Sequence, residues 1–249
     1  MKTKIVYFFI FSFLIFHFSC ESSDSDGSEA VDSGKGGSMA RFTIKGDYLY
    51  TVNNQTLKVF NIEDESTPLY QSSIDLGLGI ETIFTSDNYL FIGSQFGMYI
   101  YSLENPANPS FVSEYIHLYS CDPVVVEGNW AYVTLHSENS GCGRWVNELH
   151  IIDISNIASP QTRQVFQMTN PLGLGVLDNR LFVCDAGLKV YDITNVPEIQ
   201  LLYTFDIPAR DVIPLPGRVI VIAEDGVYQY NYTNNVIELI SKLSIDLAS

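Results

Sequence analysis

Short apolar segments separated by polar turns recur from residue 40 onward, and this pattern predicts β-strands joined by hairpins. Five two-residue turns, built mostly from Gly, Asn and Asp, suit the positive φ that tight hairpins require. With the residue that follows each turn, they are Gly46-Asp47-Tyr48, Asp87-Asn88-Tyr89, Gly128-Asn129-Trp130, Asp178-Asn179-Arg180 and Pro216-Gly217-Arg218. The steps between the third residues are 41, 41, 50 and 38, so we expect five related units.

Each turn is followed by one apolar strand and, after a loop, by a second strand with a recurring polar residue. The second strands read LKVFNI from Leu57, MYIYSL from Met98, LHIIDI from Leu149, LKVYDI from Leu188 and VYQYNY from Val227. The fifth residue is always Asn, Ser or Asp, whose short side chain can accept from a backbone N–H two residues later. We therefore expect this side chain to start the next turn.

Four strands in each of five units predict an all-β fold, a five-bladed β-propeller. Residues 40–249 divide into units of about 42 residues, which is the size of a four-stranded blade and too short for a βαβ unit. The blades are expected at 40–76, 80–118, 121–168, 171–207 and 210–246, and ring closure would rest on packing between the first and the fifth. A β-sandwich is the alternative, but five near-equal units would be a coincidence there.

The second strands of the third and fourth units carry a family resemblance. LHIIDI at 149–154, followed by SNIASP at 155–160, and LKVYDI at 188–193 resemble the LVIVD repeat family of bacterial and archaeal surface proteins. The resemblance extends over all five units and is weakest in the fifth. It implies a β-propeller without an assigned biochemical role.

The first twenty residues have the pattern of a signal peptide. Two lysines precede an almost wholly apolar run at 5–19, which is too short to span a membrane. Phe18-Ser19-Cys20 then resembles the lipobox of bacterial lipoproteins, which implies a signal peptide at 1–19 and a lipid on Cys20. Secretion without a lipid and an uncleaved anchor are the alternatives.

Residues 20–39 are predicted to form a flexible tether after the lipidated cysteine. The segment 21–38 has five acids, one lysine and no aromatic residue, so it cannot bury enough apolar surface to fold. An acidic Ser/Asp run at this place resembles the surface-export tether of Bacteroidetes lipoproteins. It implies a lipid anchor in the bacterial outer membrane, with the protein periplasmic or surface-exposed; a plain solvated spacer is the alternative.

The charge and the motifs exclude several function classes. A net charge of −16 repels phosphate backbones and anionic headgroups, so we expect no nucleic acid partner and membrane contact only through the lipid. The sequence contains no HExxH, GxSxG, CxxC or P-loop motif. We therefore expect a protein that is not an enzyme and that needs no cofactor.

Two of the four cysteines are placed to form a disulfide. Cys121 begins the inner strand of the third blade and Cys142 lies in that blade's long insertion, so both are expected at the same end of the blade. A metal site with His136 as third ligand, or free thiols, are the alternatives. Cys184 ends an apolar strand and is expected to be buried.

Aligning the units brings out one charged cluster. Seven places before the second turn residue the units carry Ala40, Glu81, Asp122, Leu172 and Arg210, and Asp211 follows the last of these. The inner strand of each blade lines the channel, so Glu81, Asp122, Arg210 and Asp211 are expected at its mouth. Two carboxylates there could hold Ca²⁺ or act as a glycosidase pair; salt bridges within the cluster are the alternative.

The same end is expected to carry the insertion of the third blade and several aromatic side chains. These further candidate ligand-binding residues are Trp145, Arg144, His136, Tyr119 and Phe96. An exposed Trp beside an Arg suits stacking on a sugar ring or docking on a protein. The alternative is that Trp145 folds back over the channel mouth.

Taken together, these features predict a non-catalytic binding or scaffold module of the cell envelope, with an envelope protein as partner. A lectin-like propeller that binds a glycan is the alternative, and a glycoside hydrolase comes third. Ca²⁺ at the channel mouth is the one metal ion considered.

Overall fold

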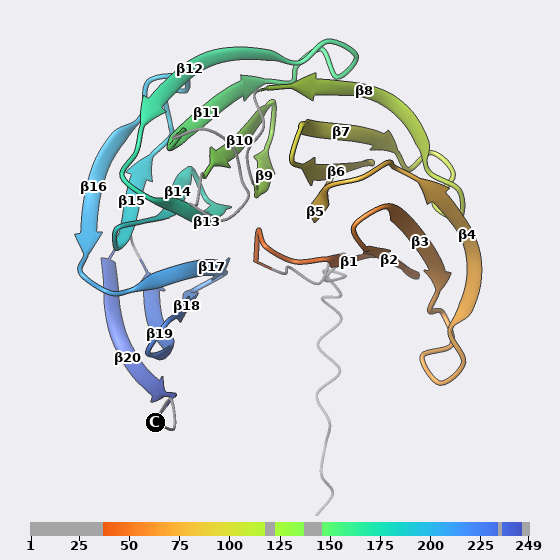
Figure 1. Ribbon diagram of the computed structural model, residues 1–249. Coiled ribbons are helices and arrows are strands. Elements are labelled where there is room, and N and C mark those ends of the chain that lie inside the picture. Colours follow the sequence, from red (N-terminus) through yellow and green to blue (C-terminus); the bar gives the residue numbers. More distant parts are fainter. Residues whose placement is uncertain (1–36, 118–122, 137–145, 234–235, 246–249) are drawn as a thin grey trace, which may run out of the picture. The chain divides into compact units, whose positions relative to one another are not determined.

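The computed structural model describes residues 37–117, 123–136, 146–233 and 236–245, all within one compact unit, Val31–Ser249. The described residues form twenty strands in five four-stranded antiparallel sheets. They contain no helix that could span a membrane. The predicted all-β, five-bladed propeller is confirmed, with β1, β5, β9, β13 and β17 as the innermost strands (Figure 1).

Each sheet is a meander in chain order. Sheet 1 consists of β1 (Phe42–Lys45), β2 (Tyr48–Val52), β3 (Thr56–Asn61) and β4 (Leu69–Asp75). Sheet 2 consists of β5 (Ile80–Ser86), β6 (Tyr89–Ser94), β7 (Gly97–Ser102) and β8 (Ser110–Ile116). Sheet 3 consists of β9 (Val124–Glu127), β10 (Trp130–Leu135), β11 (Glu148–Asp153) and β12 (Gln161–Gln167). Sheet 4 consists of β13 (Pro171–Leu177), β14 (Arg180–Asp185), β15 (Leu188–Asp192) and β16 (Gln200–Phe205). Sheet 5 consists of β17 (Ala209–Leu215), β18 (Arg218–Ala223), β19 (Gly226–Thr233) and β20 (Val236–Ser244).

The predicted hairpin turns lie between the first two strands of every sheet, and each contains a residue with positive φ. The residues are Gly46, Asp87, Gly128, Asp178, Asn179 and Gly217. The recurring Asn, Ser or Asp starts the next turn as expected in four sheets. Its oxygen accepts from a backbone N–H two residues later at 3.0, 3.2, 2.9 and 2.8 Å, at Asn61, Ser102, Asp153 and Asp192.

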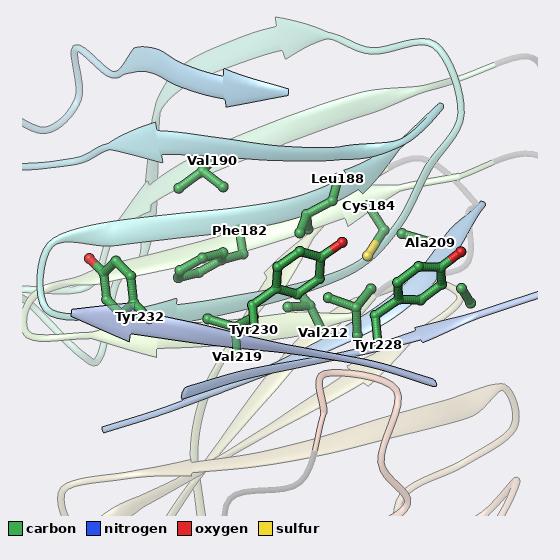
Figure 2. Packing of buried hydrophobic residues seen from close by; sticks show 12 residues of the cluster. Phe182, Cys184, Leu188, Val190, Ala209, Val212, Val219, Tyr228, Tyr230 and Tyr232 are labelled. Carbon is green, nitrogen blue, oxygen red and sulfur yellow. The ribbon is translucent and has the colours of Figure 1, made fainter. Parts of the chain in front are cut away.

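A buried apolar cluster joins each pair of consecutive sheets. Between sheets 4 and 5, Phe182 meets the ring of Tyr232 edge-on at 5.9 Å, and Cys184 lies fully buried near Tyr228 (Figure 2). Burial raises the pKa of the Cys184 thiol well above its usual value. The prediction that Cys184 is a small buried apolar residue is confirmed.

The packing expected between the first and fifth blades is not found among the described residues. The four buried clusters join sheets 1 and 2, 2 and 3, 3 and 4, and 4 and 5, and no such cluster joins sheet 5 to sheet 1. Instead, Ser38 lies among the inner strands: its hydroxyl donates to Asp211 (3.1 Å) and accepts from the Leu174 N–H (2.8 Å). The segment before β1 therefore connects sheets 4 and 5 to the start of sheet 1.

Candidate functional site

The described charged residues of the predicted channel mouth bond within the chain. Arg210 Nη2 donates to Glu224 Oε1 at 2.7 Å, and both side chains are about half exposed. Gln95 Nε2 donates to Glu81 Oε1 at 3.2 Å. Both of these partners, Glu224 and Gln95, lie outside the predicted cluster.

Asp211, near the start of β17, is half-buried. It accepts from the Ser38 hydroxyl (3.1 Å), the Met39 N–H (3.4 Å) and the Val212 N–H (2.9 Å). Burial raises the pKa of Asp211, and the hydrogen bonds lower it by a smaller amount. A Cβ at Gly37 would lie 2.0 Å from Asp211 Oδ2, so a larger residue there would displace this carboxylate. Asp211 thus holds the segment before β1 in place.

Two of the predicted ligand-binding residues, Phe96 and His136, differ in how exposed their side chains are. Phe96 lies in the turn between β6 and β7 and is 46% exposed. His136 directly follows β10 and is buried. Several predicted positions lie outside the described residues, namely Cys20, Tyr119, Cys121, Asp122, Cys142, Arg144 and Trp145. The disulfide and the stacking role of Trp145 therefore stay predictions.

The predicted Ca²⁺ site stays a prediction as well, since it needs Asp122. Within the part of the chain that the structure describes, no group of three or more His, Cys, Asp or Glu side chains is placed to hold a metal ion.

A cavity that the sequence analysis missed lies at the opposite end of the inner strands. It measures about 250 Å³. Residues from sheets 1 to 4 line it, namely Lys45, Phe84, Thr85, Ser86, Asp87, Val126, Glu127, Gly128 and Val176. Lys45, Ser86 and Glu127 are the last residues of β1, β5 and β9. The inner strands converge here, so side chains far apart in the sequence face one space.

A second cavity of about 190 Å³ shares four lining residues with the first, namely Ser86, Asp87, Val126 and Gly128. It runs between sheets 2 and 3 past Tyr89 and Asn129. The two form one groove, which we call the hairpin groove. Its inner part carries both an ammonium and carboxylates, and its outer part carries a phenol and an amide.

A column of the repeat alignment could have pointed to this groove. The residue just before each hairpin turn is Lys45, Ser86, Glu127, Leu177 and Leu215. Polar and charged residues in the first three units, against leucine in the last two, mark one side of the channel. The charged cluster predicted from the sequence lies at the other end of the same strands.

Comparison with known proteins supports the prediction that the chain contains LVIVD repeats. The LVIVD repeat family model matches residues 120–166, which include β9 to β11 and most of β12. Residues 120–166 are an LVIVD repeat. This LVIVD repeat coincides with the third of the five units, one of the two whose second strand carries the resemblance most clearly.

Solved structures resemble the chain as a whole. A protein from Lactobacillus plantarum has a TM-score of 0.63 at 14% identity, covering 80% of this chain and 69% of its own. A candidate 6-phosphogluconolactonase from Bacteroides fragilis has a TM-score of 0.63 at 10% identity, covering 82% and 70%. BamB from Moraxella catarrhalis has a TM-score of 0.51 at 12% identity, covering 80% and 58%.

At these identities the likeness shows a propeller fold and no more. A search of curated proteins finds no match. The LVIVD repeat and the propeller architecture are therefore what the comparisons establish.

Proposed function

We propose that this protein is a non-catalytic binding module of the bacterial cell envelope and that its partner is a protein. The observation that carries the proposal is the hairpin groove, where side chains of four sheets face one shared space beside charges of both signs. At the other end of the channel, Arg210, Asp211 and Glu81 bond within the chain. A general acid or a metal ligand needs a carboxylate that is available to its substrate or ion.

The chemistry of the groove favours a polypeptide over a sugar. Lys45, Asp87 and Glu127 place an ammonium and two carboxylates along the groove, and a protein segment presents both kinds of charge. A sugar site depends on an exposed aromatic face; of the aromatic side chains that line the groove, Phe91 is 1% exposed, and Phe84 and Tyr89 are half-buried. Glycan binding remains the second candidate because of Trp145 and Phe96.

A binding experiment with two matched variants tests this proposal. Ser86→Trp places a large ring in the groove, whereas Leu215→Trp changes the equivalent position of sheet 5, which does not line it. We expect the parent and Leu215→Trp to retain the same envelope protein from membrane extract, and Ser86→Trp to lose it at least tenfold. Equal retention by all three would contradict the groove as the site. Binding to a glycan array in millimolar Ca²⁺ would favour the carbohydrate alternative.

The envelope location is part of the proposal and is supported by the signal-peptide pattern, Cys20 and the acidic tether. Cys20→Ser should abolish incorporation of labelled fatty acid and release the protein from the membrane fraction. Retention of the variant in membranes would show that another feature anchors it. The fold likeness to a candidate lactonase, at 10% identity, carries no activity to this chain.

A further inference from the structure

The hairpin groove lies at an acidic end of the propeller. In each antiparallel meander, the turn between the first two strands and the turn between the last two lie at the same end, which we call the hairpin end. Where the structure describes them, these turns contain eight acidic residues and no Lys, Arg or His. All eight are exposed, namely Asp47, Glu63, Asp64, Glu65, Asp87, Glu104, Asp178 and Glu198.

The turns at the opposite end have a different charge. Their described residues include three acids, Asp206, Glu224 and Asp225. Two of the three form ion pairs, Glu224 with Arg210 at 2.7 Å and Asp225 with Lys242 at 2.6 Å. The excess of negative charge in the turns therefore lies at the hairpin end.

Basic residues on the strands near the hairpin end are too few to balance the turn acids. Among the described residues these are Lys45, Arg163, Arg180 and Arg218. Arg163 already pairs with Asp153 at 2.7 Å, and Arg180 pairs with Asp192 at 3.1 Å. Even with the other two bases counted in full, the eight turn acids leave this end strongly negative.

We propose that the segment held in the hairpin groove is cationic, a stretch of the partner protein rich in Lys and Arg. This inference rests on the proposed function, in which the groove binds a protein. Asp87 belongs both to the groove and to the turn acids. Asp47 and Asp178 each follow a lining residue by two positions, Lys45 and Val176 respectively. A chain that lies in the groove therefore passes carboxylates of sheets 1, 2 and 4.

The spread of the acids favours an extended cation over a metal ion. They lie on separate turns of three sheets, and no group of three or more His, Cys, Asp or Glu side chains in the described part of the chain is placed to hold a metal. Several ammonium or guanidinium groups along one polypeptide can each meet a different turn, whereas one ion cannot. Nucleic acid and anionic headgroups are repelled by this end.

The place where the chain enters the propeller leaves the hairpin end accessible. The segment before β1 lies at the opposite end, where the Ser38 hydroxyl donates to Asp211 near the start of β17 (3.1 Å). A lipid on Cys20, as proposed above, would therefore join the protein to the membrane from the end opposite the turn acids. A partner can then approach those acids from the aqueous side.

The turn acids and the groove should affect different steps of binding. Charges at the rim of an interface act mainly on the rate of association, and salt screens them. Side chains that fill the groove act mainly on the rate of dissociation. The two contributions can therefore be measured separately.

Stopped-flow binding of fluorescent octalysine to the full chain in a non-ionic detergent tests the charge. The triple variant Asp47→Asn, Asp87→Asn, Asp178→Asn neutralises the acids around the groove, and Asn tolerates the positive φ of Asp87 (48°) and Asp178 (52°). The matched control, with the same change in net charge at the opposite end, is the triple variant Asp75→Asn, Asp206→Asn, Glu224→Gln.

At about 50 mM NaCl we expect the groove triple variant to lower the association rate about tenfold and the control less than twofold. Octaglutamate should not bind. Ser86→Trp should increase the dissociation rate of octalysine, because its ring takes the place of the peptide in the groove. No binding of octalysine to the parent, or equal effects of the two triple variants, would overturn the proposal. An unchanged dissociation rate in Ser86→Trp would place the peptide outside the groove and also overturn it.

The envelope protein retained in the experiment above separates this inference from the proposed function. If its retention depends on Ser86 but is the same in the groove triple variant and the parent, the groove binds a protein and the cationic partner is wrong. If Ser86→Trp retains it fully, the proposed function itself fails. Loss of retention in both Ser86→Trp and the groove triple variant, with the control triple variant unchanged, supports both.

Discussion

Asp153 illustrates how a single short side chain fixes a turn of the repeat. Its Oδ1 accepts from the N–H (2.9 Å) and the hydroxyl (2.6 Å) of Ser155, and its Oδ2 accepts from Arg163 Nη2 (2.7 Å). These bonds lower the pKa of Asp153 to about 2, with the Ser155 hydroxyl as the largest cause. The turn between β11 and β12 therefore depends on the ionised carboxylate.

Replacing this carboxylate should cost stability in a pH-dependent way. We expect Asp153→Ala to lower the free energy of unfolding by about 1 kcal/mol at pH 7. The folded pKa lies below the unfolded value of 3.8, so this stabilisation is present above about pH 4 and is lost as the pH falls towards 2. Urea unfolding of both proteins at pH 7 and pH 2.5 measures it, and a difference that does not shrink at low pH would contradict the assignment.

At Gly97 the backbone of the neighbouring strand approaches so closely that it leaves no room for a side chain. Its φ is 154°, and a Cβ there would lie 2.0 Å from the carbonyl oxygen of Tyr115. Gly46 also has a positive φ, of 53°, but a Cβ there meets nothing within 4 Å. Gly97→Ala should therefore cost roughly 2–4 kcal/mol and Gly46→Ala about 1 kcal/mol. Thermal unfolding of the two variants compares them, and equal losses would show that backbone conformation alone decides.

The roles of turn residues were predictable because they depend on residues close by in the sequence. The hairpin turns and the Asn, Ser or Asp that starts the following turn were found from the sequence, since each depends on neighbours within three residues. The partners of Asp211 were not predictable, because Ser38 lies 173 positions away and contacts it only after five sheets have formed. Asp211 was therefore expected to face a ligand, whereas it binds the segment before β1.

At the scale of elements, a hydrogen-bonded chain of side chains connects two blades. Tyr115 on β8 bonds through its hydroxyl to His150 Nδ1 (2.9 Å) on β11, and His150 Nε2 bonds to Glu148 Oε2 (2.7 Å). Burial lowers the pKa of His150, while Glu148 raises it and His117 lowers it. The contact between sheets 2 and 3 therefore stabilises the neutral imidazole of His150.

Acidification should weaken this contact. A folded pKa below the unfolded 6.5 means that the contribution of His150 is complete above about pH 6.5 and is lost as the pH falls through the folded pKa. His150→Gln keeps a polar side chain that does not titrate. We expect it to reduce the change in melting temperature between pH 7 and pH 5. Tyr115→Phe, the control, should lose about 1 kcal/mol at pH 7 and keep the pH dependence; an unchanged pH profile of His150→Gln would contradict the role of this imidazole.

The strands themselves were predictable, and the spaces between them were not. Period-two patterning and regular turns gave all five four-stranded units, because both properties belong to one sheet. The hairpin groove depends on Lys45, Ser86 and Glu127 meeting from three different strands. Where such a groove forms is decided by packing across the channel, and no single repeat contains that information.

For the whole molecule, the decisive feature is that, among the described residues, buried apolar clusters join each inner sheet to two neighbours and each terminal sheet to one. Stability in such an array is close to a sum of repeat and interface terms. Sheets 1 and 5 share no buried cluster in the described part of the chain. The ends should therefore open more readily than the middle.

The same Phe→Ala substitution at two equivalent positions tests whether the terminal sheets open more readily than the inner ones. Phe182 and Phe91 occupy the same repeat position and are both fully buried, in the clusters between sheets 4 and 5 and between sheets 2 and 3. Each Phe→Ala change should cost about 3–5 kcal/mol at its interface. In dilute solution, Phe182→Ala should remove hydrogen-exchange protection from β18 and β19 while β6 and β7 keep theirs, because only the last interface is weakened. Phe91→Ala should instead uncouple β1 to β8 from β9 to β20. If either variant lost protection uniformly over all five sheets, the propeller would unfold as one closed cooperative ring, and the independence of its ends would be wrong.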